Sequence, residues 1–486
     1  AFLLAVLAVL FGEGLVRPGR LQALTDVLDA VGRVAARFPP ESVERSTGGP
    51  AATIREVARE FAAAPSAACY GRGGTSTQPF GTLATWLADA INLVTGNLDR
   101  EGGAMFPRPA ADSLPLARLL GLAGSFDRWR SRVRGLPEFA GELPVATMAD
   151  EMLGPGPGRV RALVTLTGNP VLSAPNGTRI DEALAGLDLV VAIDYYVNET
   201  TRHAHYVFPP VSPLEHDHFD VVFSLFAVRN VARYSKPLFA PPAGAREDWE
   251  IVLDLAAAIE SNRRLFGRLR GWVRKRLGRV FSPRRSLDFM LRTGPHRGLS
   301  LAKVAEAEHG IDLGPLTPCL PGRLSHPGRR IRIAPPELLA DLPRLEAWID
   351  RPAPSLELVG RRELRSNNSW MHNCPSLVTG RERCTLRMHP ADAASRGLAA
   401  GQTVEVRSRV GSIRVPLEVT DEMMPGVVSL PHGWGHSRAG AKLSVAGRRP
   451  GASANDVTDD LFLDDLSGTA AFSGTPVEVT AAPRAE

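Results

Sequence analysis

The spacing of apolar residues predicts helices and short buried strands in the first part of the chain. Apolar positions recur at helical intervals in the opening run, over residues 20–38 and over residues 51–64, which predicts three helices. After Pro65, a short apolar run, the glycine loop 71–74 and a periodic stretch over 82–93 predict a strand, a loop and a helix.

Two longer apolar runs follow. Residues 161–166 and 189–193 each predict a buried strand, and residues 179–188 between them predict a helix. This alternation indicates an α/β fold with a doubly wound parallel sheet. In such sheets ligands bind outside the carboxyl ends of the strands. Polar residues at those ends are therefore the first candidates for a site.

The pattern changes near residue 356, where six short strand-like runs begin, separated by Gly, Pro and Asp turns and by one short helix over 391–398. Such spacing predicts a compact β barrel. We expect an α/β domain over residues 1–245, a helical and irregular connecting region over 246–352 and a β-barrel domain over 353–486.

Positive charge is concentrated in residues 263–285, which contain ten basic residues and no acid. Subtracting those ten from the net charge of +5 leaves −5, so the basic character is local and argues against a nucleic-acid-binding surface. The ten are Arg263, Arg264, Arg268, Arg270, Arg274, Lys275, Arg276, Arg279, Arg284 and Arg285. Apolar residues recur among them at helical spacing: Leu265, Leu269, Trp272, Val273, Leu277 and Val280. The predicted basic helix could fit a membrane surface or an acidic partner, but a solvated helix in a loop insertion is the simpler interpretation.

The chain opens on Ala1 rather than Met, which indicates a sequence cut from, or processed out of, a longer one. Its opening apolar run is too short to cross a bilayer and predicts a buried helix. The cysteines are Cys69, Cys319, Cys374 and Cys384, and none belongs to a CxxC pair. They predict isolated thiols rather than a zinc or iron-sulfur site, and they favour a cytoplasmic protein.

Two clusters fit the phosphates and the nucleoside of an extended anionic ligand. Gly71, Arg72, Gly73 and Gly74 let backbone amides and one cation approach a phosphate, although a tight turn would explain the glycines too. Gly168, Asn169 and Pro170 follow one predicted strand, and Asp194 closes the next. An acid there can accept hydrogen bonds from a ribose or a guanine, whereas taken alone it could be a loop acid.

A third cluster lies in the predicted barrel, in the runs RSNNSWMHN at residues 365–373 and PHGWGH at 431–436, joined by Asn455. Asn, His and Trp side chains offer the flat surfaces and the paired donors and acceptors that a pterin ring needs. Taken singly, Trp370 and Trp434 could equally be core residues.

The histidines form two further patterns. His203 with His205, and His216 with His218, have a spacing that a metal could use, but surface histidines explain it more simply. His372, His432 and His436 fit hydrogen bonding to a cofactor better than metal ligation. We assign no metal ligand and no catalytic residue in this chain.

Together these residues resemble the molybdopterin oxidoreductases, which include formate dehydrogenases, nitrate reductases and dimethyl sulfoxide reductase. The resemblance runs in order through nearly the whole chain. It is carried by YGRGGTSTQPFG, LVTGNLDREGG, TGNPVLSAPNG, IDYYVNETTRHAHYVFPP, RSNNSWMHN, the block from His389 to Val415 and LPHGWGH. It implies a bis(molybdopterin guanine dinucleotide) cofactor carrying Mo or W, bound by the α/β domain and capped by a C-terminal barrel of double-psi type.

The resemblance also implies a set of cofactor-binding residues. These are Gly71, Arg72, Gly73, Gly74, Gln78, Gly168, Asn169, Pro170, Asp194, Thr200, Arg361, Arg365, Asn367, Asn368, Ser369, Trp370, His372, Asn373, His432, Gly433, Trp434 and Asn455. The family's metal ligand and its usual 4Fe-4S cluster motif would lie upstream of Ala1. His205 departs from the family pattern, which usually has Asp at that place.

The expected function is oxo or hydride transfer at Mo or W on a small-molecule substrate, with an electron-transfer partner protein and no nucleic acid. The alternative is a non-catalytic cofactor-binding or structural subunit of the same fold. The residues upstream of Ala1 would distinguish the two.

Overall fold

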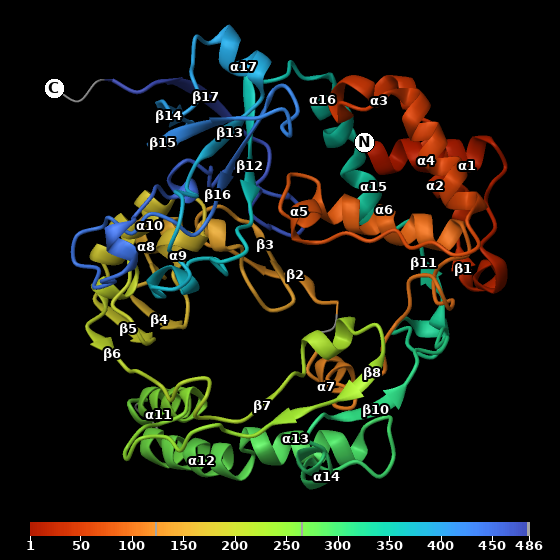
Figure 1. The fold of residues 1–486 in the computed structure, drawn as a ribbon. Coiled ribbons are helices and arrows are strands. Elements are labelled where there is room, and N and C mark those ends of the chain that lie inside the picture. The colour runs from red at the N-terminus through yellow and green to blue at the C-terminus, as the bar shows by residue number, and fades with distance from the viewer. Residues whose placement is uncertain (122–123, 264–265, 484–486) are drawn as a thin grey trace. The chain divides into compact units, whose positions relative to one another are not determined.

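The computed structural model describes residues 1–121, 124–263 and 266–483, and the chain divides into two compact units (Figure 1). Unit 1 contains residues 1–70, 86–123 and 210–339, and unit 2 contains residues 71–85, 124–209 and 340–486. No helix in the described ranges is long and apolar enough to span a bilayer. Each unit is described by itself below.

Unit 1 is mostly helical. Its helices are α1 (Phe2–Gly12), α2 (Leu28–Ala35), α3 (Pro40–Thr47), α4 (Ala51–Ala63), most of α6 (Gly81–Val94), α7 (Leu114–Leu119), α11 (Asp248–Ser261), α12 (Gly267–Val280), α13 (Pro283–Thr293), α14 (Leu301–Glu306) and most of α15 (Pro336–Ala340). Three two-stranded sheets join β1 (Thr25–Asp26) to β11 (Ile331–Arg332), β8 (Asn230–Ala232) to β10 (Ile311–Gly314), and β7 (His218–Phe219) to β9 (Tyr234–Ser235). The opening run is the buried helix that its sequence predicts, with Leu4, Leu7 and Leu10 fully covered.

Two predictions in this unit are wrong. The helix expected over residues 20–38 is interrupted, because Thr25 and Asp26 pair in parallel with Ile331 and Arg332, and α2 begins only after that pairing. The strand expected after Pro65 does not form. The Asn92 side chain accepts from the Cys69 N–H and donates to the Cys69 carbonyl, both at 2.8 Å, and so supplies the bonds that a neighbouring strand would make.

The predicted basic helix is two helices. Phe281 and Ser282 separate α12 from α13, which begins at Pro283, so Arg284 and Arg285 belong to α13. Arg264 and Leu265 lie outside the described residues. Proline fits the first turn of a helix but not its interior, and it therefore sets this boundary.

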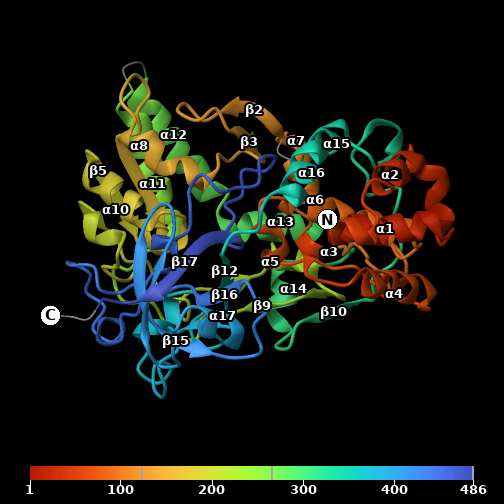
Figure 2. The ribbon, with the colours of Figure 1, turned by 90° about the horizontal axis from the view of Figure 1, so that it is seen from above.

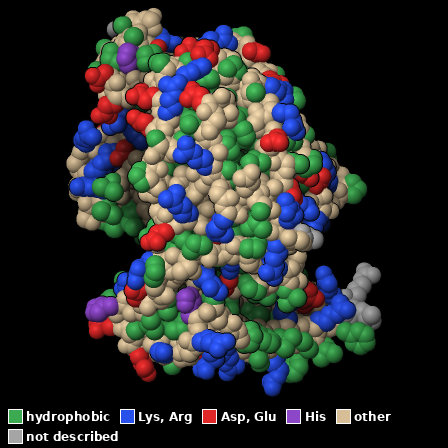
Figure 3. All heavy atoms as spheres, turned by 90° about the vertical axis from the view of Figure 1, so that its right-hand side faces the viewer, with side chains coloured by type: hydrophobic (Ala, Val, Ile, Leu, Met, Phe, Trp, Pro, Cys, Tyr) green, Lys and Arg blue, Asp and Glu red, His purple; other side chains and the backbone are tan. Residues whose placement is uncertain are grey.

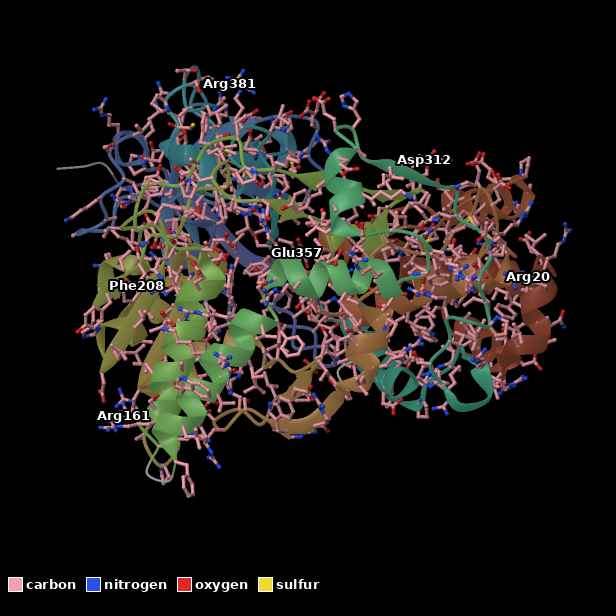
Figure 4. The ribbon with its side chains drawn as sticks, turned by 90° about the horizontal axis from the view of Figure 1, so that it is seen from below. Arg20, Arg161, Phe208, Asp312, Glu357 and Arg381 are labelled. Carbon is pink, nitrogen blue, oxygen red and sulfur yellow. The ribbon has the colours of Figure 1, made fainter. Side chains whose placement is uncertain are left out.

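Unit 2 contains a parallel sheet of three strands, β4 (Ala162–Leu166), β5 (Leu189–Ile193) and β6 (Tyr206–Val207), in that order. Its helices are α5 (Gly73–Ser76), α8 (Met148–Leu153), α9 (Pro170–Ser173), α10 (Gly177–Ala185), α16 (Leu342–Asp350) and α17 (Pro390–Ser395), and the hairpin of β2 (Phe126–Arg130) and β3 (Pro137–Phe139) belongs to it. Figure 4 labels Arg161, before β4, and Phe208, after β6, which mark the amino and carboxyl edges of the sheet.

The predicted barrel is confirmed as a closed barrel in the order β12-β16-β13-β15-β14-β17. Its strands are β12 (Leu356–Arg361), β13 (Leu386–Met388), β14 (Thr403–Arg407), β15 (Ser412–Val419), β16 (Val427–Pro431) and β17 (Thr475–Ala481). Alternate residues point inward. In β15, for example, Ile413, Val415 and Leu417 are buried in the barrel core. The mixed α/β class with a C-terminal barrel is therefore as the sequence predicts.

Candidate functional site

Parallel pairing brings two of the predicted polar loops together at the carboxyl edge of the sheet. Leu166 of β4 lies beside Ile193 of β5, and the Thr167 N–H donates to the Ile193 carbonyl at 2.9 Å. The loop that carries Gly168 and Asn169 therefore starts beside Asp194. This adjacency is what the sequence predicts for the two strand ends.

A cleft of about 920 Å³ opens within unit 2, and we call it the site cleft. Its walls come from the glycine loop, the end of β4, β12 and the loop after it, the end of β16 and the segment around Asn455. Predicted residues on its walls are Arg72, Gly73, Gly74, Gly168, Asn169, Asn368, Ser369, Trp370, His432, Gly433 and Asn455. A pocket of about 90 Å³ shares Thr167, Asn169, Ser369 and Trp370 with the cleft and adds Asp194 and Asn373.

Three glycines on the wall have no conformational need to be glycine. Gly73, Gly74 and Gly360 all lack a left-handed φ, and a Cβ built on any of them meets no atom within 4 Å. Gly433 is different, because its φ is +95° and a Cβ there would lie 2.3 Å from the Asn368 carbonyl oxygen. The first three glycines thus leave open space along the wall, whereas Gly433 is required by the backbone itself.

Exposed cationic and aromatic groups line the cleft. Arg72 and Arg362 are both exposed. The Arg362 guanidinium donates to Asn368 Oδ1 at 2.6 Å and lies 3.1 Å from His432 Nε2. Burial, and then the charge of Arg362, lower the pKa of His432, so its imidazole is neutral near pH 7. The Trp370 ring is 58% exposed and offers a flat apolar surface.

Behind this wall runs a buried chain of hydrogen bonds. His372 Nδ1 lies 2.9 Å from His436 Nε2, and His436 Nδ1 lies 2.9 Å from Glu199 Oε1. Asn169 Nδ2 donates to Glu199 Oε2 at 2.8 Å, and the Thr200 hydroxyl donates to Asn169 Oδ1 at 2.6 Å. The Glu199 and His436 side chains are 0% and 1% exposed. We call these five residues the buried network.

The charges in the buried network follow from its geometry. Burial opposes ionisation of Glu199, but the hydrogen bond and charge of His436 outweigh it, and the pKa of this carboxyl lies below its usual value. Burial, and then the charge of His436, lower the pKa of His372 to about 4. His372 is therefore neutral near pH 7, and its Nε2 has no partner among the described residues.

Asp194 serves its own loop as well as the pocket. Its carboxylate accepts from the N–H groups of Tyr195 and Tyr196 at 2.6 and 3.2 Å and from Asn198 Nδ2 at 3.1 Å. Burial raises the pKa of this carboxyl, against those hydrogen bonds. Asp194 therefore has the role of a loop acid and also lines the smaller pocket.

Other predicted residues lie near the cleft without lining it. Arg361, the last residue of β12, donates to the carbonyls of Ser429, Arg383 and Thr385. These bonds fix the start of the loop that follows β12. Trp434 packs in the barrel core with its ring 4.1 Å from that of His372. Gly71, Gln78, Pro170, Thr200, Arg365, Asn367 and His372 also lie outside the walls of the cleft and of the smaller pocket.

The sequence predicts that His436 and the loop from Arg361 to Asn373 lie near the cofactor, but it does not single out Glu199 or Arg362. Arg362 could have been found from its place between two predicted residues. Glu199 gave no local signal, because its partner His436 is 237 positions away.

His203 and His205, the first of the two histidine pairs, each bind a protein group. His203 Nε2 lies 2.6 Å from Asp181 Oδ1, and His205 Nδ1 accepts from the Val190 N–H. Across the described ranges, no group of three or more His, Cys, Asp or Glu is arranged to hold a metal ion. Burial raises the pKa of Cys319 and of Cys384 to about 11, so these two thiols are protonated near pH 7. Cys374 is the one cysteine with an exposed side chain.

Two family models match this chain, one over the segment that contains the parallel sheet and one over the barrel. A family model for the molybdopterin oxidoreductases matches residues 55–258, and a model for the molybdopterin dinucleotide binding domain matches residues 356–476. The second match covers nearly the whole barrel. It confirms the expected cofactor class, a molybdopterin dinucleotide that carries Mo or W.

Individual proteins are also similar to this chain over most of its length. The chain is 25% identical to the alpha subunit of F420-dependent formate dehydrogenase 2 of Methanococcus maripaludis, over 86% of this chain and 61% of that protein. It is 23% identical to the catalytic subunit of the assimilatory nitrate reductase of Bacillus subtilis, over 91% of this chain and 64% of the relative. Acetylene hydratase from Pelobacter acetylenicus has the same fold, with a TM-score of 0.74 and 17% identity over 99% of this chain and 70% of that one. The chain thus spans about three fifths of the length of these curated relatives.

Proposed function

This chain belongs to the molybdopterin oxidoreductase family, and on that premise we propose that the site cleft of unit 2 holds a bis(molybdopterin guanine dinucleotide) with Mo or W. The open space along the cleft wall supports this most directly. Neither packing nor backbone conformation requires Gly73, Gly74 or Gly360 to lack a side chain, so a ligand lying against them explains the glycines.

The exposed residues fit the parts of such a ligand. Arg72 and Arg362 would neutralise its phosphates, and the indole of Trp370 would stack on a flat ring. Asp194, at the end of β5, would accept hydrogen bonds from a guanine or a ribose. The remaining predicted residues would act as neighbours that hold these groups in place.

When bound, the cofactor supplies a redox-active metal held by its own dithiolene sulfurs. The protein's part is to bind it, orient it and fix protons around it. With Glu199 ionised, His436 donates from Nδ1 to that carboxylate, and a hydrogen bond joins His436 Nε2 to His372 Nδ1.

We propose that the complete protein is an oxidoreductase of the formate dehydrogenase or nitrate reductase type that transfers an oxo group or a hydride at the metal. The same proposal includes a small-molecule substrate, an electron-transfer partner protein, a cytoplasmic location and an iron-sulfur cluster. The relatives support it, since those named are a formate dehydrogenase subunit and a nitrate reductase catalytic subunit.

The test is metal and nucleotide analysis of the purified complete gene product. We expect Mo or W, and about two guanine nucleotides for each metal, released on acid hydrolysis. Arg362→Gln should lower both contents, whereas Arg414→Gln, at an exposed position of β15, should leave them unchanged. Absence of both metals would overturn the proposal. Full cofactor content without turnover of formate, nitrate or related substrates would favour the non-catalytic alternative.

A further inference from the structure

The helix α12 of unit 1 turns its glycines, not its apolar side chains, toward the helix beside it. Helices α11 and α12 lie side by side in both ribbon views (Figure 2). A Cβ on Gly271 would lie 2.6 Å from the Ala257 carbonyl oxygen, and one on Gly278 would lie 2.4 Å from a Leu253 methyl group. The contact face of α12 is thus made of glycines and buries little apolar surface of its own.

The apolar side chains of α12 remain exposed beside α11. At 100° per residue, Leu269, Val273, Leu277 and Val280 form one stripe whose centre lies about 150° around the helix from Gly271 and Gly278. Leu269, Val273 and Leu277 line an open hollow together with Leu253 and Glu260 of α11. With Trp272 at the edge of the stripe and Phe281 just beyond the helix, these six side chains are 37% to 69% exposed. A helix that merely covers a protein surface points its apolar stripe inward, so the solvated-helix interpretation does not explain α12.

Basic residues flank this stripe. On the same projection, Arg268 and Arg279 lie along one edge, and Arg270 lies along the other. Arg276 does not flank the stripe but lies between Trp272 and Leu269 on this projection, with its guanidinium 5.7 Å from the centre of the Trp272 ring. Arg274 and Lys275 are paired with Glu260 and Asp254 of α11.

Four of these arginines form no ion pair within the described residues. No carboxylate of a described residue lies within 4.0 Å of Arg268, Arg270, Arg276 or Arg279. By contrast, the face drawn in Figure 3 has Lys and Arg side chains interspersed with Asp and Glu. An apolar stripe bordered by unpaired cations is the pattern of a helix that lies in a membrane interface.

We propose that α12 is a docking surface for an anionic lipid bilayer, with the stripe in the acyl-chain boundary and the arginines at the headgroups. The guanidinium groups can reach headgroup phosphates while their aliphatic stems stay on the apolar surface. A strongly acidic protein surface would satisfy the arginines but would offer the six large apolar side chains less apolar surface than lipid acyl chains do. With 14 residues, α12 is too short to cross the bilayer and lies along its surface.

The test is vesicle flotation of the complete gene product. We expect binding to vesicles of phosphatidylglycerol and phosphatidylcholine in about equal parts, weakening with salt, and little binding to pure phosphatidylcholine. Replacing Arg268, Arg270, Arg276 and Arg279 with Gln should reduce binding by about tenfold or more. The pair Trp272→Gln and Leu277→Gln should reduce it by a similar factor, because the stripe would lose its largest groups.

A matched control changes the same charge elsewhere in unit 1. Arg33, Arg233, Arg297 and Arg332 are exposed and lie outside α12, and their replacement with Gln should leave binding within about twofold. Three results would overturn the proposal: no flotation of the wild type, equal loss in the control, or full binding after the Trp272 and Leu277 changes. Specific capture of an acidic protein without flotation would assign the surface to a protein instead.

Discussion

Two sets of polar residues meet at the site cleft, and they differ in where their hydrogen bonds go. The buried network bonds mainly within itself, and Glu199 has both carboxylate oxygens occupied by His436 and Asn169. Arg72, Arg362 and Trp370 are instead exposed on the wall. The comparison implies that the two sets have different roles. The buried network holds the loops in place, and the exposed residues of the wall contact the ligand. Changes in the first set should lower stability, and changes in the second should lower cofactor content.

The largest effect is expected from Glu199→Ala. It leaves His436 and Asn169 as buried donors without an acceptor, which should cost about 3–5 kcal/mol. For a unit of this size we expect the melting temperature of unit 2 to fall by about 6–20 °C, measured by calorimetry. Glu199→Gln keeps the shape and one acceptor and should cost clearly less. A melting temperature of Glu199→Ala equal to that of the wild type would show that the network holds nothing in place.

The next effect is a pH dependence carried by His372. Its pKa is about 4 in the folded protein and near 6.5 when unfolded, so below pH 6.5 the unfolded chain takes up a proton that the folded chain does not. The stability contributed by neutral His372 is complete above pH 6.5 and is lost as the pH falls toward 4. At pH 5 the loss should be about 2 kcal/mol.

The measurement compares urea unfolding at pH 7.5 and pH 5 for the wild type and His372→Gln, which cannot titrate. The wild type should lose more stability than the variant over this interval, by about 2 kcal/mol. Glu199 does not confound the comparison, because its lowered pKa places its own loss of stability at still lower pH. Equal losses in the two proteins would remove His372 as the source.

Two glycines of the cleft, Gly433 and Gly360, allow a structural position and a ligand-facing position to be compared with the same substitution. Gly433→Ala forces a side chain onto a backbone with a φ of +95°, against the Asn368 carbonyl oxygen, and should cost about 1–3 kcal/mol. Gly360→Ala enters open space at ordinary φ and should change stability by less than about 0.5 kcal/mol, but it should lower the metal content. Calorimetry and metal analysis of both variants check this. The reverse assignment, with Gly360→Ala unstable and fully loaded, would contradict it.

The same difference between the two sets explains what could be predicted from the sequence. The barrel was predictable strand by strand, because Ile413, Val415 and Leu417 alternate with exposed residues and report their own burial. The wall residues at the strand ends were predictable, since a parallel sheet places its carboxyl ends at one edge. The pairing of Glu199 with His436, the interruption at Thr25 and the bonds of Cys69 with Asn92 depend on segments distant in sequence. Local periodicity contains no information on such contacts.

The smallest effect on stability is expected from Trp370→Ala. Because the indole is 58% exposed, its removal should change the free energy of unfolding by less than about 0.5 kcal/mol. Loss of one stacking surface should speed cofactor release by up to about tenfold, measured as the metal retained after dilution and gel filtration. Trp129→Ala provides the control, because Trp129 is also exposed but lies on β2, away from the cleft walls. Equal retention in the two variants would mean that Trp370 does not contact the cofactor, and contact with the ligand would then rest on the arginines alone.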